Sequence, residues 1–110
     1  MELNKLYHGN CFSLMRDIPD KSIDLILSDP PFNCLNKSNN SAKWDKEIDL
    51  QELWKQYERI IKDNGAILLF AFGIFDAKLI LSNPKLWKTT LIWDKVRKTG
   101  FLNAKKMPMR

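Results

Sequence analysis

The chain has 110 residues and a mass of 12.9 kDa, enough for one modest domain with its own hydrophobic core. Its 45% hydrophobic and 28% charged residues exclude a disordered or fibrous chain. We expect a cytoplasmic protein with no membrane partner, because no apolar run reaches the roughly 20 residues of a membrane helix and residues 1–10 lack the apolar stretch of a signal peptide.

The charge is divided unevenly along the chain. Its net value of +5 comes from 18 basic and 13 acidic residues. Residues 1–76 hold 9 basic and 12 acidic residues, a net charge of −3, whereas residues 77–110 hold 9 basic residues and one acid, a net charge of +8. The basic last third favours a polyanionic partner, with a solvated basic surface as the alternative. The two cysteines, Cys11 and Cys34, and the single His8 predict neither a disulfide framework nor a metal site.

The first half of the chain predicts a helix, a turn, a strand and a loop. Apolar residues recur at helical spacing over Cys11–Ile18, and Pro19–Ser22 is typical of a turn. The β-branched run Ile23–Ser28 fits a buried strand. Asn33–Asp49 is long and polar, which indicates a mobile or functional loop. Its first part, Asn33–Lys43, could close over a ligand, with disorder as the alternative.

The second half begins with the clearest helix. From Leu50 to Ile61 the apolar residues fall on one face, which assigns Trp54 to packing. Asp49 and Glu52 form a capping-box pattern, and Asn64-Gly65 predicts a left-handed helix stop.

Three further elements follow. Ala66–Phe72 is an unbroken apolar run that suits a central parallel strand covered on both faces. Phe75–Leu81 predicts a helix that ends before Pro84, and Trp87–Trp93 alternates like a half-buried strand. Strands that alternate with helices predict an α/β fold with a largely parallel sheet.

Ligands bind such sheets beyond the carboxyl ends of the strands, which selects the segment that follows Ile23–Ser28. It is Asp29-Pro30-Pro31-Phe32. Two prolines stiffen the chain there and leave a carboxylate, a carbonyl oxygen and an aromatic ring at the strand end. Two acceptors and a stacking ring suit a flat ligand with an exocyclic amino group, such as a nucleobase. The alternative is a turn with a capping Asp29 and a core Phe32.

The tetrapeptide and the blocks around it resemble the DNA amino-methyltransferases. SDPPF matches their Asp-Pro-Pro-Tyr/Phe motif. LYHGNCFSLMRDIPDKSIDLILSDPPF is similar to the opening block of the permuted subgroup that places its catalytic half first, and the blocks from WDKEIDL and TLIWDK follow in the expected order. The resemblance implies a Rossmann-like methyltransferase fold, present in part, that transfers a methyl group from S-adenosylmethionine to an exocyclic amino group of double-stranded DNA.

The resemblance also implies roles for individual residues. Asp29, Pro30, Pro31 and Phe32 would form the catalytic motif, in which Phe32 stacks on a flipped base and the oxygens of Asp29 and Pro30 accept from its amino group. An Asp in this motif favours adenine, with cytosine as the alternative. Asn10 and Cys11, with Asp29, would contact the methyl donor, although Asn10 replaces the family's acidic residue and could instead cap the helix. Six basic residues are expected to contact DNA phosphates: Lys95, Arg97, Lys98, Lys105, Lys106 and Arg110.

The family's donor-binding loop, Phe-x-Gly-x-Gly, has no match. The four glycines are Gly9, Gly65, Gly73 and Gly100, and no two are separated by one residue. We therefore expect residues 1–110 to be the N-terminal catalytic half of a truncated or split enzyme with weak donor binding. Strand Ile23–Ser28 would then keep an unpaired apolar edge, which favours self-association or a complementing chain. The alternative is a non-catalytic remnant that retains a DNA-binding surface.

Overall fold

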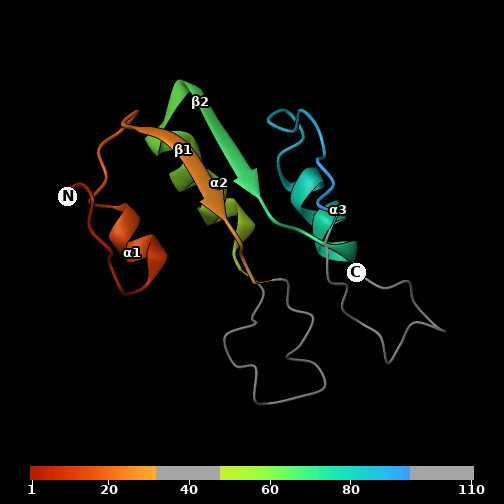
Figure 1. Cartoon of the computed structure of the whole chain (residues 1–110), viewed down its shortest axis with the longest axis horizontal. Helices are drawn as coiled ribbons and strands as arrows, with labels where there is room; N and C mark the ends of the chain where they lie inside the picture. The colour runs from red at the N-terminus through yellow and green to blue at the C-terminus, as the bar shows by residue number, and fades with distance from the viewer. Residues whose placement is uncertain (32–47, 95–110) are drawn as a thin grey trace, which may run out of the picture.

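The computed structural model describes residues 1–31 and 48–94. These residues form a small α/β structure around a two-stranded parallel sheet (Figure 1), so the predicted fold class is confirmed at the α/β level. The elements in chain order are α1 (Cys11–Met15), β1 (Ile23–Ser28), α2 (Leu50–Ile60), β2 (Ile61–Leu69) and α3 (Gly73–Ser82). No helix within the described ranges is long and apolar enough to span a membrane.

The sheet is the product of one strand–helix–strand unit. β1 and β2 run parallel, and α2 makes the crossover between them. The register is regular from Leu25 opposite Ala66 to Ser28 opposite Leu69, with an irregularity just before it. Gly65 lies at that irregularity, where an added Cβ would come within 2.9 Å of the Asp24 carbonyl oxygen. The missing side chain therefore permits the close approach of the two strands.

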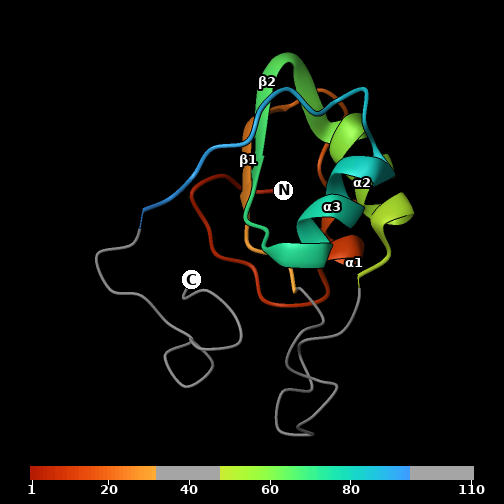
Figure 2. The same cartoon turned by 90° about the vertical axis from the view of Figure 1, so that its right-hand side faces the viewer.

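The core lies on one side of the sheet. Leu53, Tyr57 and Ile60 of α2 are buried together with Met15 of α1. Side chains from the inner face of both strands pack against this cluster, namely Ile23, Ile26, Ile67 and Leu69. Figure 2 shows all three helices on this side, with α3 beside α2.

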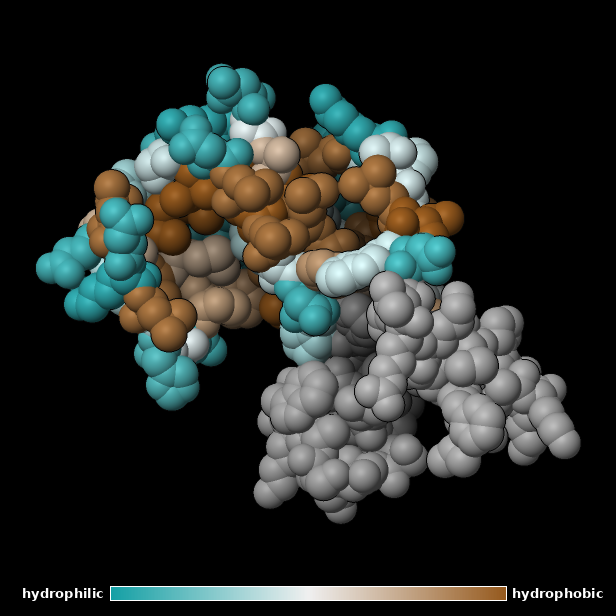
Figure 3. Space-filling view, viewed as in Figure 1, coloured by the Kyte–Doolittle hydropathy of each residue, from teal (hydrophilic) through white to brown (hydrophobic). Residues whose placement is uncertain are grey.

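The opposite face of the sheet is open over the described residues. Leu25 and Leu27 of β1 are 52% and 62% exposed, and Leu68 and Phe70 beside them are 43% and 37% exposed. Apolar side chains gather over β1 and β2 in the space-filling view (Figure 3). The predictions of a buried first strand and of a second strand covered on both faces are therefore wrong for this structure, because α2 covers only one face.

Side-chain hydrogen bonds hold α2 at both ends. Asp49 caps its first turn, since its Oδ1 accepts from the backbone nitrogens of Gln51 and Glu52 at 3.1 and 3.2 Å. The predicted cap is confirmed, but Glu52 accepts from Gln56 Nε2 instead of closing the box. At the other end, the Arg59 guanidinium donates to the carbonyl oxygens of Met15 and Ile18, each at 2.7 Å, and so ties α2 to the α1 region.

Several predicted boundaries differ from the structure. The first helix ends at Met15, three residues early, and β2 spans Ile61–Leu69 instead of Ala66–Phe72. The predicted left-handed stop at Asn64-Gly65 is wrong, because α2 ends at Ile60 and the chain passes directly into an extended Ile61.

α3 begins at Gly73, two residues before the predicted start and with a φ of +62° that a glycine adopts without strain. The predicted strand Trp87–Trp93 is also wrong. These residues form no strand and are exposed in the structure. An alternating pattern needs a neighbouring strand to pair with, and the sheet of the described residues contains only β1 and β2.

Candidate active site at the carboxyl edge of the sheet

The parallel strands bring two chain segments to the same edge. β1 ends at Ser28 and β2 at Leu69, which are opposite each other in the register. The Phe70 nitrogen donates to the Ser28 carbonyl oxygen at 3.0 Å, so the pairing continues one step beyond the strands. Asp29 and the loop that begins at Phe70 therefore leave the sheet side by side, at the edge where α/β proteins bind ligands.

The motif after β1 combines an exposed acid with an anchored proline. Asp29 is exposed, Pro30 is buried and Pro31 is half-buried. This arrangement fixes the backbone beside a carboxylate that remains accessible to a ligand. Phe32 lies outside the described residues, as do the loop Asn33–Lys43 and the six basic residues predicted to contact DNA, from Lys95 to Arg110.

Asn10 serves as the N-cap of α1. Its Oδ1 accepts from the backbone nitrogens of Phe12 and Ser13, at 3.0 and 3.2 Å. The capping alternative is therefore confirmed, and both lone pairs of this oxygen have a partner within the helix. Cys11, the next residue, is an exposed free thiol. The donor contacts expected for Asn10 and Cys11 stay predictions.

Tyr57 interacts with a residue at each of the two motifs. It is buried in the core on α2 and interacts with Ser28, which directly precedes Asp29, and with Cys11. Burial raises the pKa of the Tyr57 hydroxyl above its ordinary value; a hydrogen bond with Ser28 opposes the rise, and the charge of Cys11 adds to it. The sequence identifies Tyr57 as a core residue of an amphipathic helix, but its place beside both motifs depends on tertiary packing.

A second feature that sequence reasoning missed is the aromatic pair beside the motif. Phe70 follows β2, and its ring lies 5.3 Å from that of Trp93 at an interplanar angle of 44°. In the continued register Phe70 is opposite Asp29. The apolar run Ala66–Phe72 predicted a strand here, but only the parallel register reveals which of its residues adjoins the acid.

The chain is similar in sequence to several Type II methyltransferases. It is 34% identical to Type II methyltransferase M.BamHI of Bacillus amyloliquefaciens, over 93% of this chain and 22% of that protein. It is 32% identical to M.HinfI of Haemophilus influenzae, over 93% of this chain and 36% of that protein. With M.BglII of Bacillus subtilis the identity is 35%, over 59% of this chain and 18% of that protein. No protein-family model and no solved structure matches the chain.

These similarities place the chain, at the level of family, among the DNA methyltransferases. The relatives are of Type II, the class that takes part in restriction–modification. The resemblance seen in the SDPPF segment and its neighbouring blocks is thereby confirmed at the level of DNA methyltransferases. The chain spans between 18% and 36% of the length of the three relatives named.

Proposed function

We propose that residues 1–110 are the N-terminal catalytic half of a DNA methyltransferase domain with a Rossmann-like fold. The reaction is the transfer of a methyl group from S-adenosylmethionine to the exocyclic amino group of an adenine flipped out of double-stranded DNA. The observation that carries the proposal is the placement of Asp29, an exposed carboxylate beside the buried Pro30 at the carboxyl edge of a parallel sheet.

Asp29, Pro30 and Phe32 would promote methyl transfer by positioning the base and by electrostatic stabilisation. The lone pair of an aromatic amino group is delocalised into the ring, which makes the nitrogen a poor nucleophile. The Asp29 carboxylate and the Pro30 carbonyl oxygen accept its two N–H groups, which favours a tetrahedral nitrogen whose lone pair is available. Phe32 stacks on the base and holds its plane.

S-adenosylmethionine supplies an activated methyl group on a sulfonium. The adenine nitrogen forms the new N–C bond as the S–C bond breaks, and the electron pair of that bond stays on sulfur. The methylated nitrogen then loses one proton, for which the Asp29 carboxylate is the nearest base in the proposed motif. No covalent bond to the enzyme forms, so Cys11 and Cys34 have no nucleophilic role.

The DNA partner is expected to lie against the basic last third of the chain, where the six predicted phosphate contacts fall. These contacts would orient the duplex and add salt dependence without reading its sequence. Donor binding by this chain alone is expected to be weak, because the chain has no Gly-x-Gly segment and the Asn10 oxygen already caps a helix.

A complementing chain, or a second copy of this one, would cover the apolar edge and face of β1. Leu25 and Leu27 are exposed there, and no strand of the described residues pairs with the outer edge of β1. Exposed apolar edges favour association. Static light scattering at rising concentration should show self-association of the chain alone, and a monodisperse monomer at high concentration would contradict this part of the proposal.

The test of the catalytic role is methyl incorporation into duplex DNA from radiolabelled S-adenosylmethionine. The chain is assayed together with a polypeptide that carries a Phe-x-Gly-x-Gly donor loop. Activity that depends on both polypeptides and is lost in Asp29→Ala supports the proposal. A complemented chain that binds duplex DNA but transfers no methyl group would instead support the non-catalytic remnant.

A further inference from the structure

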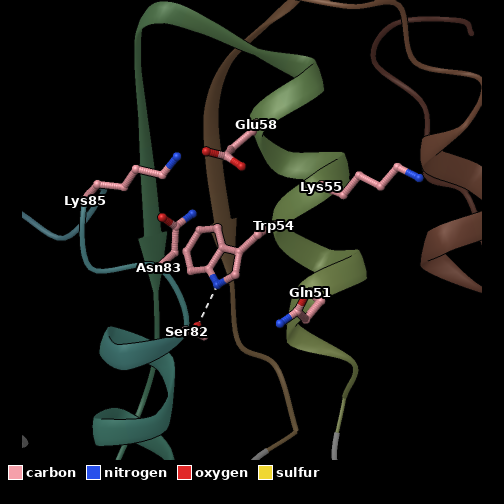
Figure 4. A pocket seen from close by; sticks show the side chains of 7 residues that line it. All are labelled: Gln51, Trp54, Lys55, Glu58, Ser82, Asn83 and Lys85. Atoms are coloured by element: carbon pink, nitrogen blue, oxygen red, sulfur yellow. Dashed lines mark hydrogen bonds between the residues drawn. The ribbon is translucent and has the colours of Figure 1, made fainter.

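A groove separates α2 from the turn that follows α3, away from both sequence motifs. Its volume is about 340 Å³, within the size range of small-molecule sites. Figure 4 shows Trp54 and Glu58 of α2 facing Ser82, Asn83 and Lys85 across it, while the side chain of Lys55 points away. α3 ends at Ser82 with Asn83 as its C-cap, and Pro84 follows directly.

Asn83 is the feature that sets this groove apart from an ordinary crevice. The residue is only 7% exposed, and its backbone is held by bonds to Ile80 and Leu86. Its side-chain amide makes no hydrogen bond to any other residue of the described ranges, yet it faces the groove (Figure 4). No fully buried side-chain nitrogen or oxygen of the described residues lacks a partner, so the amide atoms of Asn83 remain accessible from the groove. A ligand that offers both a donor and an acceptor would pair with them.

The Trp54 indole beside it is held in a fixed orientation. Its Nε1 donates to Ser82 Oγ at 2.7 Å, and Ser82 Oγ in turn donates to the Leu79 carbonyl oxygen at 2.6 Å. The neighbouring Tyr57 ring packs against it in a T-shaped arrangement, with an interplanar angle of 85° and the ring centroids 6.1 Å apart. A half-buried indole with its rotamer fixed is a ready platform for a flat ring.

The upper end of the groove carries two opposite charges that do not neutralise each other. Figure 4 shows the Glu58 carboxylate and the Lys85 ammonium reaching toward this end, and neither takes part in an ion pair within residues 1–31 and 48–94. An ammonium suits a phosphate, and a carboxylate suits a sugar hydroxyl.

We propose that this groove binds a purine nucleotide. The base lies on the Trp54 indole, and the Asn83 amide pairs with the amino group and N7 of an adenine, the arrangement that asparagine uses to read this base. Glu58 accepts from a ribose hydroxyl, and Lys85 faces the phosphate. The nucleotide is either a free mononucleotide or an unpaired residue of a single DNA strand, since both present the same base and phosphate. Trp54, for which the sequence favoured packing over base stacking, would then also have a binding role.

The experiment is a titration of the ¹⁵N-labelled full chain with AMP, followed by two-dimensional NMR. The indole signal of Trp54 and the side-chain amide signals of Asn83 should shift in a saturable way, while the backbone signals of Cys11 and Asp29 should not move. Adenosine should bind more weakly than AMP if Lys85 faces the phosphate. A single-stranded oligonucleotide with one adenine in a thymine tract distinguishes the sources, because a strand-binding site prefers it to AMP.

Matched variants make the assignment specific. Asn83→Ala and Trp54→Leu should each weaken AMP binding about tenfold or more. The controls Asn64→Ala and Trp87→Leu, which alter exposed residues outside the groove, should leave it unchanged. Asn83→Ala and Lys85→Ala keep the test informative if Trp54→Leu does not fold. The absence of saturable shifts at millimolar AMP, or equal binding by Asn83→Ala, would overturn the inference.

This result is separable from the proposed catalysis. The groove residues come from α2 and from the end of α3 and its following turn, not from residues 9–11 or 28–31. Methyl transfer that depends on Asp29 with no AMP shift at Trp54 would refute the groove alone. AMP binding at Trp54 without methyl transfer would refute only the catalytic proposal.

Discussion

The two faces of the sheet have nearly the same apolar character but different surroundings. On the inner face, Ile26 and Ile67 pack on a cluster centred on Leu53, which is 1% exposed. On the outer face, Leu27 and Leu68 project from the neighbouring register positions and stay exposed over the described residues. Apolar side chains alone therefore do not make a core; a helix held against them does. The outer face therefore exposes apolar side chains that a partner could bury, and Asp29 follows directly at its carboxyl edge.

The largest expected difference between the two faces is in the folding free energy that is lost when one leucine on each side is replaced by alanine. Leu53→Ala should cost about 2–5 kcal/mol of folding free energy, because it leaves a cavity in the only fully buried part of the described core. Leu27→Ala should cost less than about 1 kcal/mol at concentrations where the chain is a monomer, since the side chain is then already in water. Urea unfolding followed by far-UV circular dichroism measures both. Equal losses would mean that the outer face is covered in solution.

A smaller effect tests what holds α2 against the inner face. Arg59→Met keeps the apolar stem but removes the donors to the Met15 and Ile18 carbonyl oxygens and the ion pair with Asp20. The loss should be about 1–3 kcal/mol, because two carbonyl oxygens near the core lose their partners. Lys62→Met, which removes only the exposed ion pair with Asp24, is the control and should cost at most about 1 kcal/mol. A control that costs as much as Arg59→Met would contradict the anchoring role.

The smallest effect concerns the pH dependence of the inner face. Burial holds the pKa of Tyr57 above its ordinary value of 10.0, so the folded state binds this proton more tightly than the unfolded state does. The stabilisation is complete below about pH 10 and is lost as the pH rises through the folded-state pKa. When the pH is raised from neutral to strongly alkaline, the unfolding free energy of the Tyr57→Phe variant should therefore fall by less than that of the unmodified chain. Urea midpoints at several pH values measure the difference, and parallel curves would show that Tyr57 does not titrate with folding.

Local signals account for the elements that the sequence predicted well. The bounds of β1, Ile23–Ser28, follow from a β-branched run between turn residues, and the start of α2 follows from Asp49 as its cap. The predictions that were wrong depend on contacts between residues far apart in the sequence. The burial of Leu27 and the strand expected over Trp87–Trp93 both require partners that a periodic pattern does not identify.

The candidate site shows the same division. The position of Asp29 follows from a general rule about parallel sheets, so the sequence was enough to predict it. The interactions of Tyr57 with Ser28 and Cys11, and the groove that Trp54 and Asn83 line together, involve segments far apart in the chain. No spacing pattern reports such meetings, because they arise only when α2 packs against α1 and α3.

One measurement tests most directly whether the Asp29-Pro30 segment that follows β1 is catalytic. Methyl transfer to duplex DNA is assayed for the complemented chain and for two variants at opposite ends of β1. Asp29→Ala should abolish incorporation, whereas Asp24→Ala, which removes an exposed carboxylate paired with Lys62, should retain it. Transfer by Asp29→Ala at the rate of the unmodified chain would contradict the proposal that this carboxylate binds the reacting amino group.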